Sequence, residues 1–189
     1  MPGRTAPSII AATRDWIERA VIGLNLCPFA KAVYAKDLIR YEVSRAETSD
    51  ELLEDLEREL LSLAATPPDA VATTLLIHPW VLTGFLDYNE FLGVAEAAVG
   101  KLGLAGVIQV ASFHPEYQFA GTKPDEVTNY TNRSPYPMLH LLREAGVDAA
   151  IAAFPDTGEI YRRNVETMRS LGVPGLVALG FASPRKRRL

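Results

Sequence analysis

The sequence predicts a single α/β domain in which a mostly parallel sheet of three to five strands is covered by helices. Short apolar segments alternate with long segments of helical periodicity. Whole helices separate successive strands, which is the spacing of parallel strands joined by crossover connections. The 189 residues, 48% of them hydrophobic, suffice for one core. A two-layer α+β arrangement stays open, because the last third of the chain is less regular.

The first part of the chain has clear patterns. Residues 8–26 carry apolar side chains at helical spacing. Residues 38–43 alternate as a short strand. Thr48 and Glu51 have the form of a capping box, and they open a predicted helix over residues 48–65 with an acidic outer face.

The middle of the chain continues the alternation. Residues 71–77 are apolar and predict a buried strand, and residues 84–102 have helical periodicity. Residues 107–113 predict a third strand. Each of these elements is separated from the next by turn residues, so a strand–helix–strand unit is expected here.

The last third is harder to interpret. Residues 112–137 are rich in Tyr, Asn, Pro, Arg and Gly and form a predicted irregular stretch. A serine followed by proline then predicts a helix over 134–146. Residues 149–154 predict a fourth strand and residues 158–171 a last helix, while residues 175–181 fit neither pattern clearly.

Composition limits the functional classes. The formal net charge of −4 and the pI near 5.4 argue against nucleic-acid binding. A single cysteine excludes an internal disulfide and suits a reducing cytoplasm. No apolar run reaches the roughly 18 residues of a membrane helix. We therefore expect a cytoplasmic protein without a membrane partner.

The two ends of the chain are expected to be flexible, at about residues 1–7 and 184–189. A basic cluster, Arg185 to Arg188, lies at the second end. A solvated terminus explains such a cluster, and weak binding to nucleic acid or acidic lipid is the alternative. The sequence does not indicate an oligomeric state.

Two of the three histidines follow predicted strands in the same way. His78 comes directly after the strand at 71–77 and His114 directly after the strand at 107–113, and a proline follows each. If these strands are parallel, both side chains lie at carboxyl ends, where open α/β sheets bind ligands. Strands lie about 4.8 Å apart, so both rings can reach one metal ion or substrate. Alternatively, each histidine caps its strand through ordinary hydrogen bonds.

These histidines suit two kinds of chemistry. A divalent metal needs a third ligand, for which the candidates are Glu116, Asp87, Cys27 and His140. Without metal, His78 and His114 would serve as general acid and base, with Glu116 nearby. His140 is expected on the solvent side of the helix at 134–146. The cofactor stays open between a metal, haem and none.

Cys27 is the third catalytic candidate, as a nucleophile or metal ligand. It follows the predicted helix at 8–26, and the negative end of a helix dipole raises the pKa of a thiol there. A buried, inert cysteine is the alternative interpretation.

The irregular stretch supplies the candidate binding residues. Polar side chains cluster just before the helix predicted at Ser134, and a helix N-terminus with a guanidinium suits a carboxylate or phosphate. The alternative is that the asparagines hold a long loop to the body of the protein. The candidates for substrate binding are Tyr117, Asn129, Tyr130, Asn132, Arg133, Ser134 and Tyr136.

Three segments resemble a family of short bacterial proteins known as domain of unknown function 1415. They are residues 23–30 (GLNLCPFA), 112–119 (SFHPEYQF) and 129–137 (NYTNRSPYP). The likeness covers roughly Trp16 to Val173. The resemblance implies a bacterial origin and assigns no activity and no catalytic residues.

The leading hypothesis is a small enzyme that acts on an anionic small molecule through acid–base or metal-assisted chemistry. His78 and His114 would form one wall of its pocket and the loop around Arg133 the other. A non-catalytic module that binds a metabolite or peptide in the same pocket is the first alternative. A thiol-dependent enzyme using Cys27 is the second.

Overall fold

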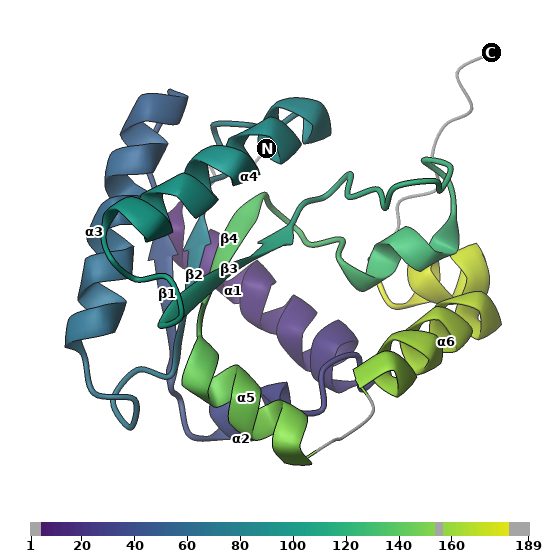
Figure 1. The fold of residues 1–189 in the computed structure, drawn as a ribbon. Helices are drawn as coiled ribbons and strands as arrows, with labels where there is room; N and C mark the ends of the chain where they lie inside the picture. Colours follow the sequence, from purple (N-terminus) through teal and green to yellow (C-terminus); the bar gives the residue numbers. More distant parts are fainter. Residues whose placement is uncertain (1–4, 154–156, 182–189) are drawn as a thin grey trace.

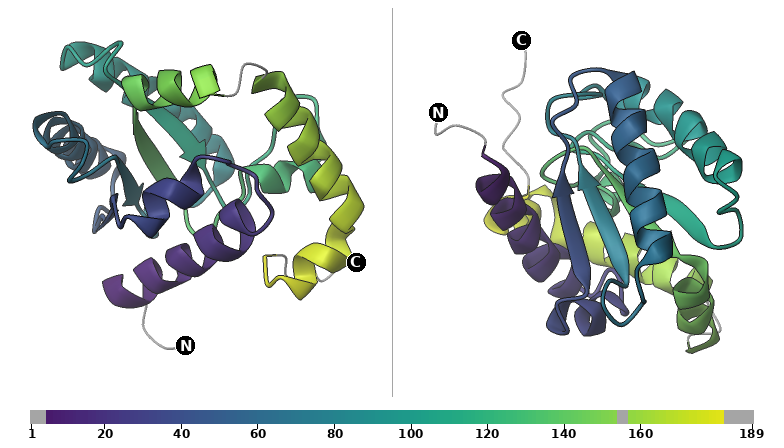
Figure 2. Two further views of the ribbon diagram at one scale, coloured as in Figure 1. Left: turned by 90° about the horizontal axis from the view of Figure 1, so that it is seen from below. Right: turned by 90° about the vertical axis from the view of Figure 1, so that its left-hand side faces the viewer.

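The computed structural model describes residues 5–153 and 157–181 as one α/β domain around a four-stranded sheet (Figure 1). Helices α3 and α4 cover one face of this sheet and α1 covers the other (Figure 2). In chain order the elements are α1 (Ala6–Trp16), the π-helix η1 (Ile17–Ile22), α2 (Ala30–Ala35), β1 (Ile39–Val43), α3 (Ser49–Ala65), β2 (Thr73–Ile77), α4 (Phe85–Lys101), β3 (Ile108–Phe113), the 3₁₀-helix η2 (Val127–Thr131), β4 (Met138–Arg143), α5 (Glu144–Ala153) and α6 (Thr157–Ala178).

The strand order is β1-β2-β4-β3, and the sheet is mixed. Only β1 and β2 pair in parallel, whereas β4 runs antiparallel to both β2 and β3. The prediction of a mostly parallel sheet is therefore wrong. Because β4 runs opposite to both of its neighbours, β1, β2 and β3 still point in one direction, and their carboxyl ends meet at the same edge.

The prediction failed at one element. Residues 138–143, which fall within the helix predicted over 134–146, form β4. Along β4, Leu139 and Leu141 pack on the α3/α4 face, while Met138 packs on the α1 face. A strand between two others is buried on both faces, and its continuous apolar run resembles a buried helix. His140 is consequently half-buried on β4 rather than exposed on a helix, and its Nε2 lies 2.8 Å from Thr73 Oγ1.

The elements after β4 differ from expectation in a similar way. Residues 149–153, predicted as a strand, belong to α5, and Phe154 lies outside the described residues. The helix predicted at 158–171 is confirmed as part of α6. A kink at Gly172, with φ of 56°, divides α6 near its end. The strand prediction failed because apolar residues are equally suited to a helix, and alanine favours one.

The strands and long helices predicted between residues 38 and 113 are confirmed. The helix predicted over 8–26 ends at Ile22 and its last part is a π-helix, and α2 was not predicted. The capping box that begins α3 is present, since Thr48 Oγ1 accepts from Glu51 N at 3.2 Å and Glu51 Oε2 accepts from Thr48 N at 3.2 Å. Helix α3 is also tied to β1, where Glu59 receives two hydrogen bonds from Arg40, at 2.7 and 3.2 Å. Of the predicted flexible ends, residues 1–4 and 184–189 lie outside the described part, whereas Ala6 and Pro7 begin α1.

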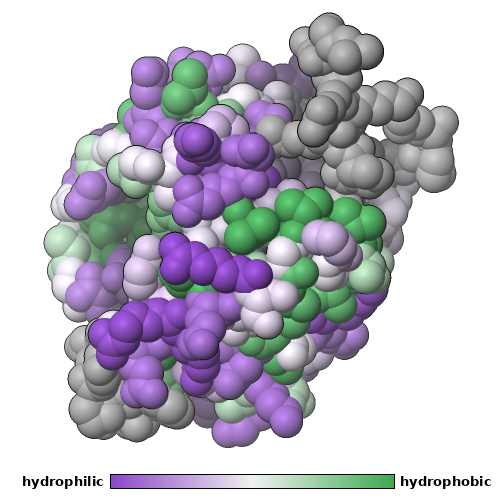
Figure 3. Space-filling view, turned by 90° about the vertical axis from the view of Figure 1, so that its right-hand side faces the viewer, coloured by the Kyte–Doolittle hydropathy of each residue, from purple (hydrophilic) through white to green (hydrophobic). Residues whose placement is uncertain are grey.

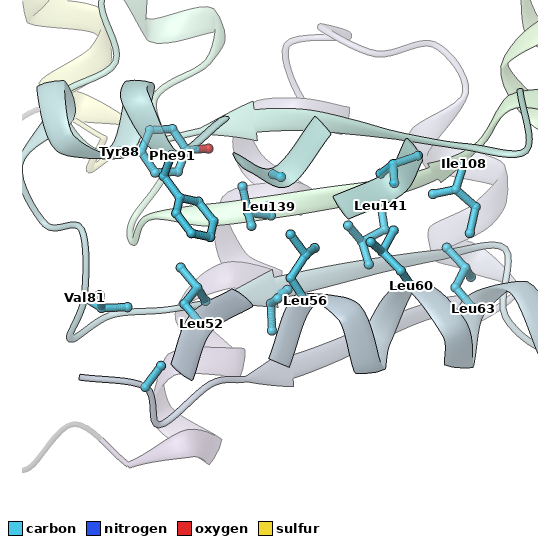
Figure 4. Close-up of a cluster of buried hydrophobic side chains, with 14 residues drawn as sticks. Leu52, Leu56, Leu60, Leu63, Val81, Tyr88, Phe91, Ile108, Leu139 and Leu141 are labelled. Carbon is cyan, nitrogen blue, oxygen red and sulfur yellow. The ribbon is translucent and has the colours of Figure 1, made fainter. Parts of the chain in front are cut away.

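Two clusters of buried side chains hold the layers together. Leucines of α3 interdigitate with Tyr88 and Phe91 of α4 over one face of the sheet (Figure 4). On the other face, Trp16 of α1 contacts Phe113 edge to face, with ring centroids 5.3 Å apart. Both faces are thus buried, which fixes the register of the central strands.

Helix α6 lies beside the sheet and packs against η2. Met168 and Leu176 of α6 are buried with Leu26, and Tyr130 of η2 packs on this group. Figure 3 views the molecule from this side and shows hydrophobic side chains gathered among polar ones; Val173 of α6 is 46% exposed. Across residues 5–153 and 157–181, no helix combines the length and apolar character needed to cross a bilayer.

Candidate functional site

Three strands end at one edge of the sheet, and a polar residue follows each of them. Ser44 follows β1, His78 follows β2 and His114 follows β3. Their backbone N–H groups continue the pairing, with Ser44 N donating to Ile77 O at 2.8 Å and His78 N to Pro137 O at 3.0 Å. The edge is therefore ordered backbone, and the three side chains leave it from defined positions.

His78 is fully buried beneath α4. Its Nδ1 lies 3.0 Å from the carbonyl oxygen of Val81, so Nδ1 carries the proton, and its ring stacks on Tyr88 with centroids 5.7 Å apart. Its Nε2 has no hydrogen-bond partner among the described residues. Burial lowers the pKa of His78 to about 4, because the imidazolium form is poorly solvated there. His78 is neutral at pH 7.

His114 is also buried, and both of its ring nitrogens are bonded. Nδ1 accepts from Glu116 N at 3.0 Å, so the proton is on Nε2, which lies 3.2 Å from Leu82 O. Burial lowers the pKa of His114 as well. The two histidines therefore hold neighbouring carbonyls of the β2–α4 loop, where Leu82 has a φ of 51° that costs a non-glycine residue about 1–2 kcal/mol.

No group of three or more His, Cys, Asp or Glu side chains suited to a metal ion exists within the described ranges. His114 has no nitrogen left for coordination. His140 lies on β4 beside Phe113, a residue of the α1-side cluster, whereas His78 stacks on α4. The geometry thus matches strand capping more closely than a shared metal site.

Asn129 organises the long loop between β3 and β4. It is fully buried, and its Oδ1 accepts from Phe119 N at 3.0 Å and from Thr122 Oγ1 at 2.8 Å. Its Nδ2 donates to Lys123 O at 2.8 Å. Asn132 acts similarly, donating from Nδ2 to Ser112 O at 3.2 Å. The asparagines hold the irregular backbone in place.

Arg133 is 7% exposed and serves the same loop. Its Nε donates to Tyr117 O at 3.1 Å, its Nη2 donates to Pro124 O at 2.6 Å, and its guanidinium lies 4.4 Å from the ring centre of Tyr130. The cavity beside Arg133 measures only about 10 Å³, roughly the space of one water molecule.

The helix N-terminus predicted at Ser134 is absent, because the chain there leads into β4. Ser134 Oγ instead donates to Tyr136 O at 2.7 Å. The structure does bring the loop beside the histidines, since His114 N donates to Asn132 O at 3.2 Å. The two predicted walls are therefore adjacent. Their polar side-chain atoms are mostly bonded to backbone: the histidine rings hold the β2–α4 loop, and Asn129 and Arg133 hold their own loop.

Cys27 lies in the turn between η1 and α2 and is partly exposed. Its side chain makes no hydrogen bond or ring contact with either strand-end histidine. The turn itself is tightly held, since Asn25 has a φ of 53° and Asn164 Nδ2 of α6 donates to Leu26 O at 2.8 Å. A Cβ at Gly23 would lie against the carbonyl of Arg19, which explains a glycine at this point.

The end of β1 is different, because an open groove of about 430 Å³ lies beyond it, over the first turns of α3. Ser44 is 2% exposed at its floor; its Oγ donates to Asp55 Oδ2 at 2.5 Å and accepts from Ala46 N at 3.0 Å. The groove is lined by Glu42, Val43, Ser44, Arg45, Ala46, Glu51, Glu54, Asp55 and Arg58.

A family model described as "Protein of unknown function (DUF1415)" matches residues 8–178. The chain belongs to this family. Comparisons with curated proteins and with solved structures give no match. All three segments that resemble the family lie in the matched range. In this DUF1415 chain they form the η1–α2 turn, the end of β3 with the start of its loop, and the approach to β4.

The groove residues of the DUF1415 chain were not among the sequence candidates. The signal that points to them is the one used for the histidines, namely a polar residue directly after a strand that ends at the carboxyl edge. Ser44 and Arg45 stand in that position after β1. The acidic face of α3, which is typical of a solvated helix surface, supplies the other side of the groove.

Proposed function

We propose that this protein binds a small polar molecule in the groove at the carboxyl end of β1, and that the molecule carries an anionic group. The observation that supports the proposal is the groove itself, about 430 Å³ at the end of the sheet's parallel strand pair. Small-molecule sites commonly have volumes of roughly 300–1,000 Å³, and open α/β sheets bind ligands beyond their strands' carboxyl ends.

The anionic group is proposed because Arg45 is exposed and makes no hydrogen bond or ion pair with the described residues. A free guanidinium is well suited to a carboxylate or phosphate. Arg133, the arginine favoured by the sequence, donates to two carbonyls of its own loop. Arg45 is therefore the better candidate for the same role.

Backbone-amide NMR tests this proposal. A library of charged and polar fragments is added to the ¹⁵N-labelled protein, and shifts are expected to concentrate in residues 42–46 and 51–58. Arg45→Ala is expected to reduce them, and Arg169→Ala, an exposed arginine of α6, is the matched control. Shifts that concentrate instead in residues 114–134, or an Arg45→Ala variant that binds as wild type does, would overturn the proposal.

A second candidate function is acid–base catalysis at His78. The specific observation is its buried, neutral Nε2, which has no hydrogen-bond partner among the described residues. The His78 ring stacks on Tyr88, and Tyr88 in turn lies against the ring of His114. Such a nitrogen can accept a proton from a substrate admitted when the β2–α4 loop moves. Side-chain ¹⁵N NMR tests this: a fragment that hydrogen-bonds Nε2 shifts its resonance, and an unchanged Nε2 resonance with every fragment of the library rejects the role.

A further inference from the structure

Most charges of the groove are already paired within the protein. Asp55 is bonded to Ser44 and lies 2.7 Å from Arg58, and Glu42 lies 2.9 Å from Arg40. Asp55, Arg58 and Glu42 line the groove, and their pairing leaves little of their charge for a ligand.

Glu51 is also engaged, because it accepts from the N–H groups of Glu47 and Thr48, at 2.8 and 3.2 Å. These bonds lower the pKa of Glu51 and keep it ionised. It belongs to the N-terminal cap of α3.

Two lining charges remain, one of each sign. Arg45 and Glu54 are both exposed, and neither makes a hydrogen bond or ion pair with the part of the chain that the structure describes. Arg45 follows β1 and Glu54 lies on α3, so they approach the groove from different elements. A ligand with a single charge satisfies only one of them.

We infer that the groove takes an amphoteric molecule, in which a carboxylate pairs with Arg45 and a guanidinium or ammonium group pairs with Glu54. This inference rests on the proposed function and names its ligand class, of which basic amino acids are the simplest members. The lining holds four carboxylates and two guanidinium groups, so its net charge is negative. A ligand whose cationic charge exceeds its anionic charge matches that balance.

The remaining lining suits the linker between the two charges. Val43 and Ala46 are its apolar members, and Ser44 supplies a hydroxyl whose proton is directed to Asp55. A short aliphatic chain packs on the first two. Exposed ion pairs each contribute little, so loss of either end group is expected to weaken binding about fivefold.

Three matched probes test the ligand class in NMR titrations at physiological ionic strength, where long-range attraction is screened. They are L-arginine, L-argininamide, which lacks the carboxylate charge, and L-citrulline, which lacks the guanidinium charge. L-Arginine is expected to bind about fivefold more tightly than either. Arg45→Ala should remove the preference over argininamide only, and Glu54→Gln the preference over citrulline only. Glu96→Gln, an exposed carboxylate of α4, is the control.

Equal binding of the three probes, tighter binding of argininamide, or no groove shifts with any of them overturns the ligand class. The proposed function is tested separately by the fragment library. Fragments that shift residues 42–46 and 51–58 while arginine does not reject the amphoteric ligand and leave the groove as a binding site. A library that shifts nothing there rejects both.

Discussion

The ends of β2 and β3 differ from the end of β1, although all three lie at one edge of the sheet. His78 and His114 are fully buried, and their ring nitrogens hold the carbonyls of Val81 and Leu82. Beyond β1, Ser44 opens onto a groove with unpaired charges. The difference teaches that histidines at this edge of the sheet can serve to hold irregular backbone, while ordinary charged and polar residues line the groove.

The physical reason is that backbone polar groups outside helices and strands need partners. The loop from His114 to Pro137 has little regular structure apart from η2, so several of its carbonyls and N–H groups are satisfied by Asn129 and Arg133, and Asn132 ties it to the carbonyl of Ser112 in β3. Residues of this kind are informative about loop structure. They mark a binding site only where polar atoms are left over.

The largest expected effect on stability comes from Asn129→Ala in the loop between β3 and β4. The substitution leaves the N–H of Phe119 and the carbonyl of Lys123 without their partner. An unsatisfied buried group costs about 1–3 kcal/mol. Because Phe119 is half-buried and Lys123 exposed, each loss should lie at the lower end of that range, and the free energy of unfolding should fall by about 2–3 kcal/mol in urea denaturation. Asn89→Ala, on the exposed face of α4, is the control and should change it by less than about 0.5 kcal/mol. A small loss for Asn129→Ala would mean that the loop is not held in this way.

A second effect of similar sign is expected from His78 below pH 6.5. Its folded-state pKa is about 4, below the ordinary value of 6.5, so the unfolded state takes up a proton that the folded state excludes. Stability is therefore constant above pH 6.5 and falls as pH falls towards 4. By linkage, this histidine should cost about 2 kcal/mol between pH 7 and pH 5.

Urea denaturation of wild type and His78→Gln at both pH values measures this contribution. The variant should be less stable at pH 7, because it loses the bond to Val81, and its stability should fall less between pH 7 and pH 5. His140 has a pKa lowered in the same direction, so some slope remains in the variant. Equal slopes for the two proteins would show that His78 is accessible to water and protons.

The sequence predicted the strands and long helices between residues 38 and 113 because their signals are local; the short helix α2 was not predicted. The alternating residues of β1, the capping box at Thr48 and the apolar run of β2 each indicate one structure without reference to distant residues. Strand β4 could not be assigned in this way. Its residues are apolar on both faces because they lie between β2 and β3, and that neighbourhood is a property of the whole fold.

The placement of the candidate site was predicted in part. The strand-end argument put His78 and His114 at one edge, and that placement holds although β4, not a direct parallel pairing, separates them. What the sequence could not supply is the occupancy of each polar atom. Whether Arg133 faces a carbonyl or a ligand depends on where the loop folds back. The anion site expected there relied on a helix that begins at Ser134, and the chain leads into β4 instead.

Ser44→Ala is expected to have an intermediate effect, because Ser44 shares features with the buried strand ends at His78 and His114 and with the groove beyond β1. It is buried like the histidines and lines the groove like Arg45. Loss of its bonds to Asp55 and Ala46 should lower the free energy of unfolding by about 1 kcal/mol and should also alter fragment shifts at residues 42–46. An effect on stability without any change in fragment binding would remove Ser44 from the proposed binding surface.

The smallest effect on stability is expected from Arg45→Ala and Glu54→Gln, which change only the groove beyond β1. Both side chains are exposed and unpaired within the described residues, so the free energy of unfolding should change by less than about 0.5 kcal/mol. Arg58→Ala is the matched comparison, since Arg58 is exposed but pairs with Asp55 at 2.7 Å. Urea denaturation at pH 7 measures all three. A loss above about 1 kcal/mol for Arg45 or Glu54 would show that these charges stabilise the fold, and the groove would then resemble the closed histidine end more than an open binding site.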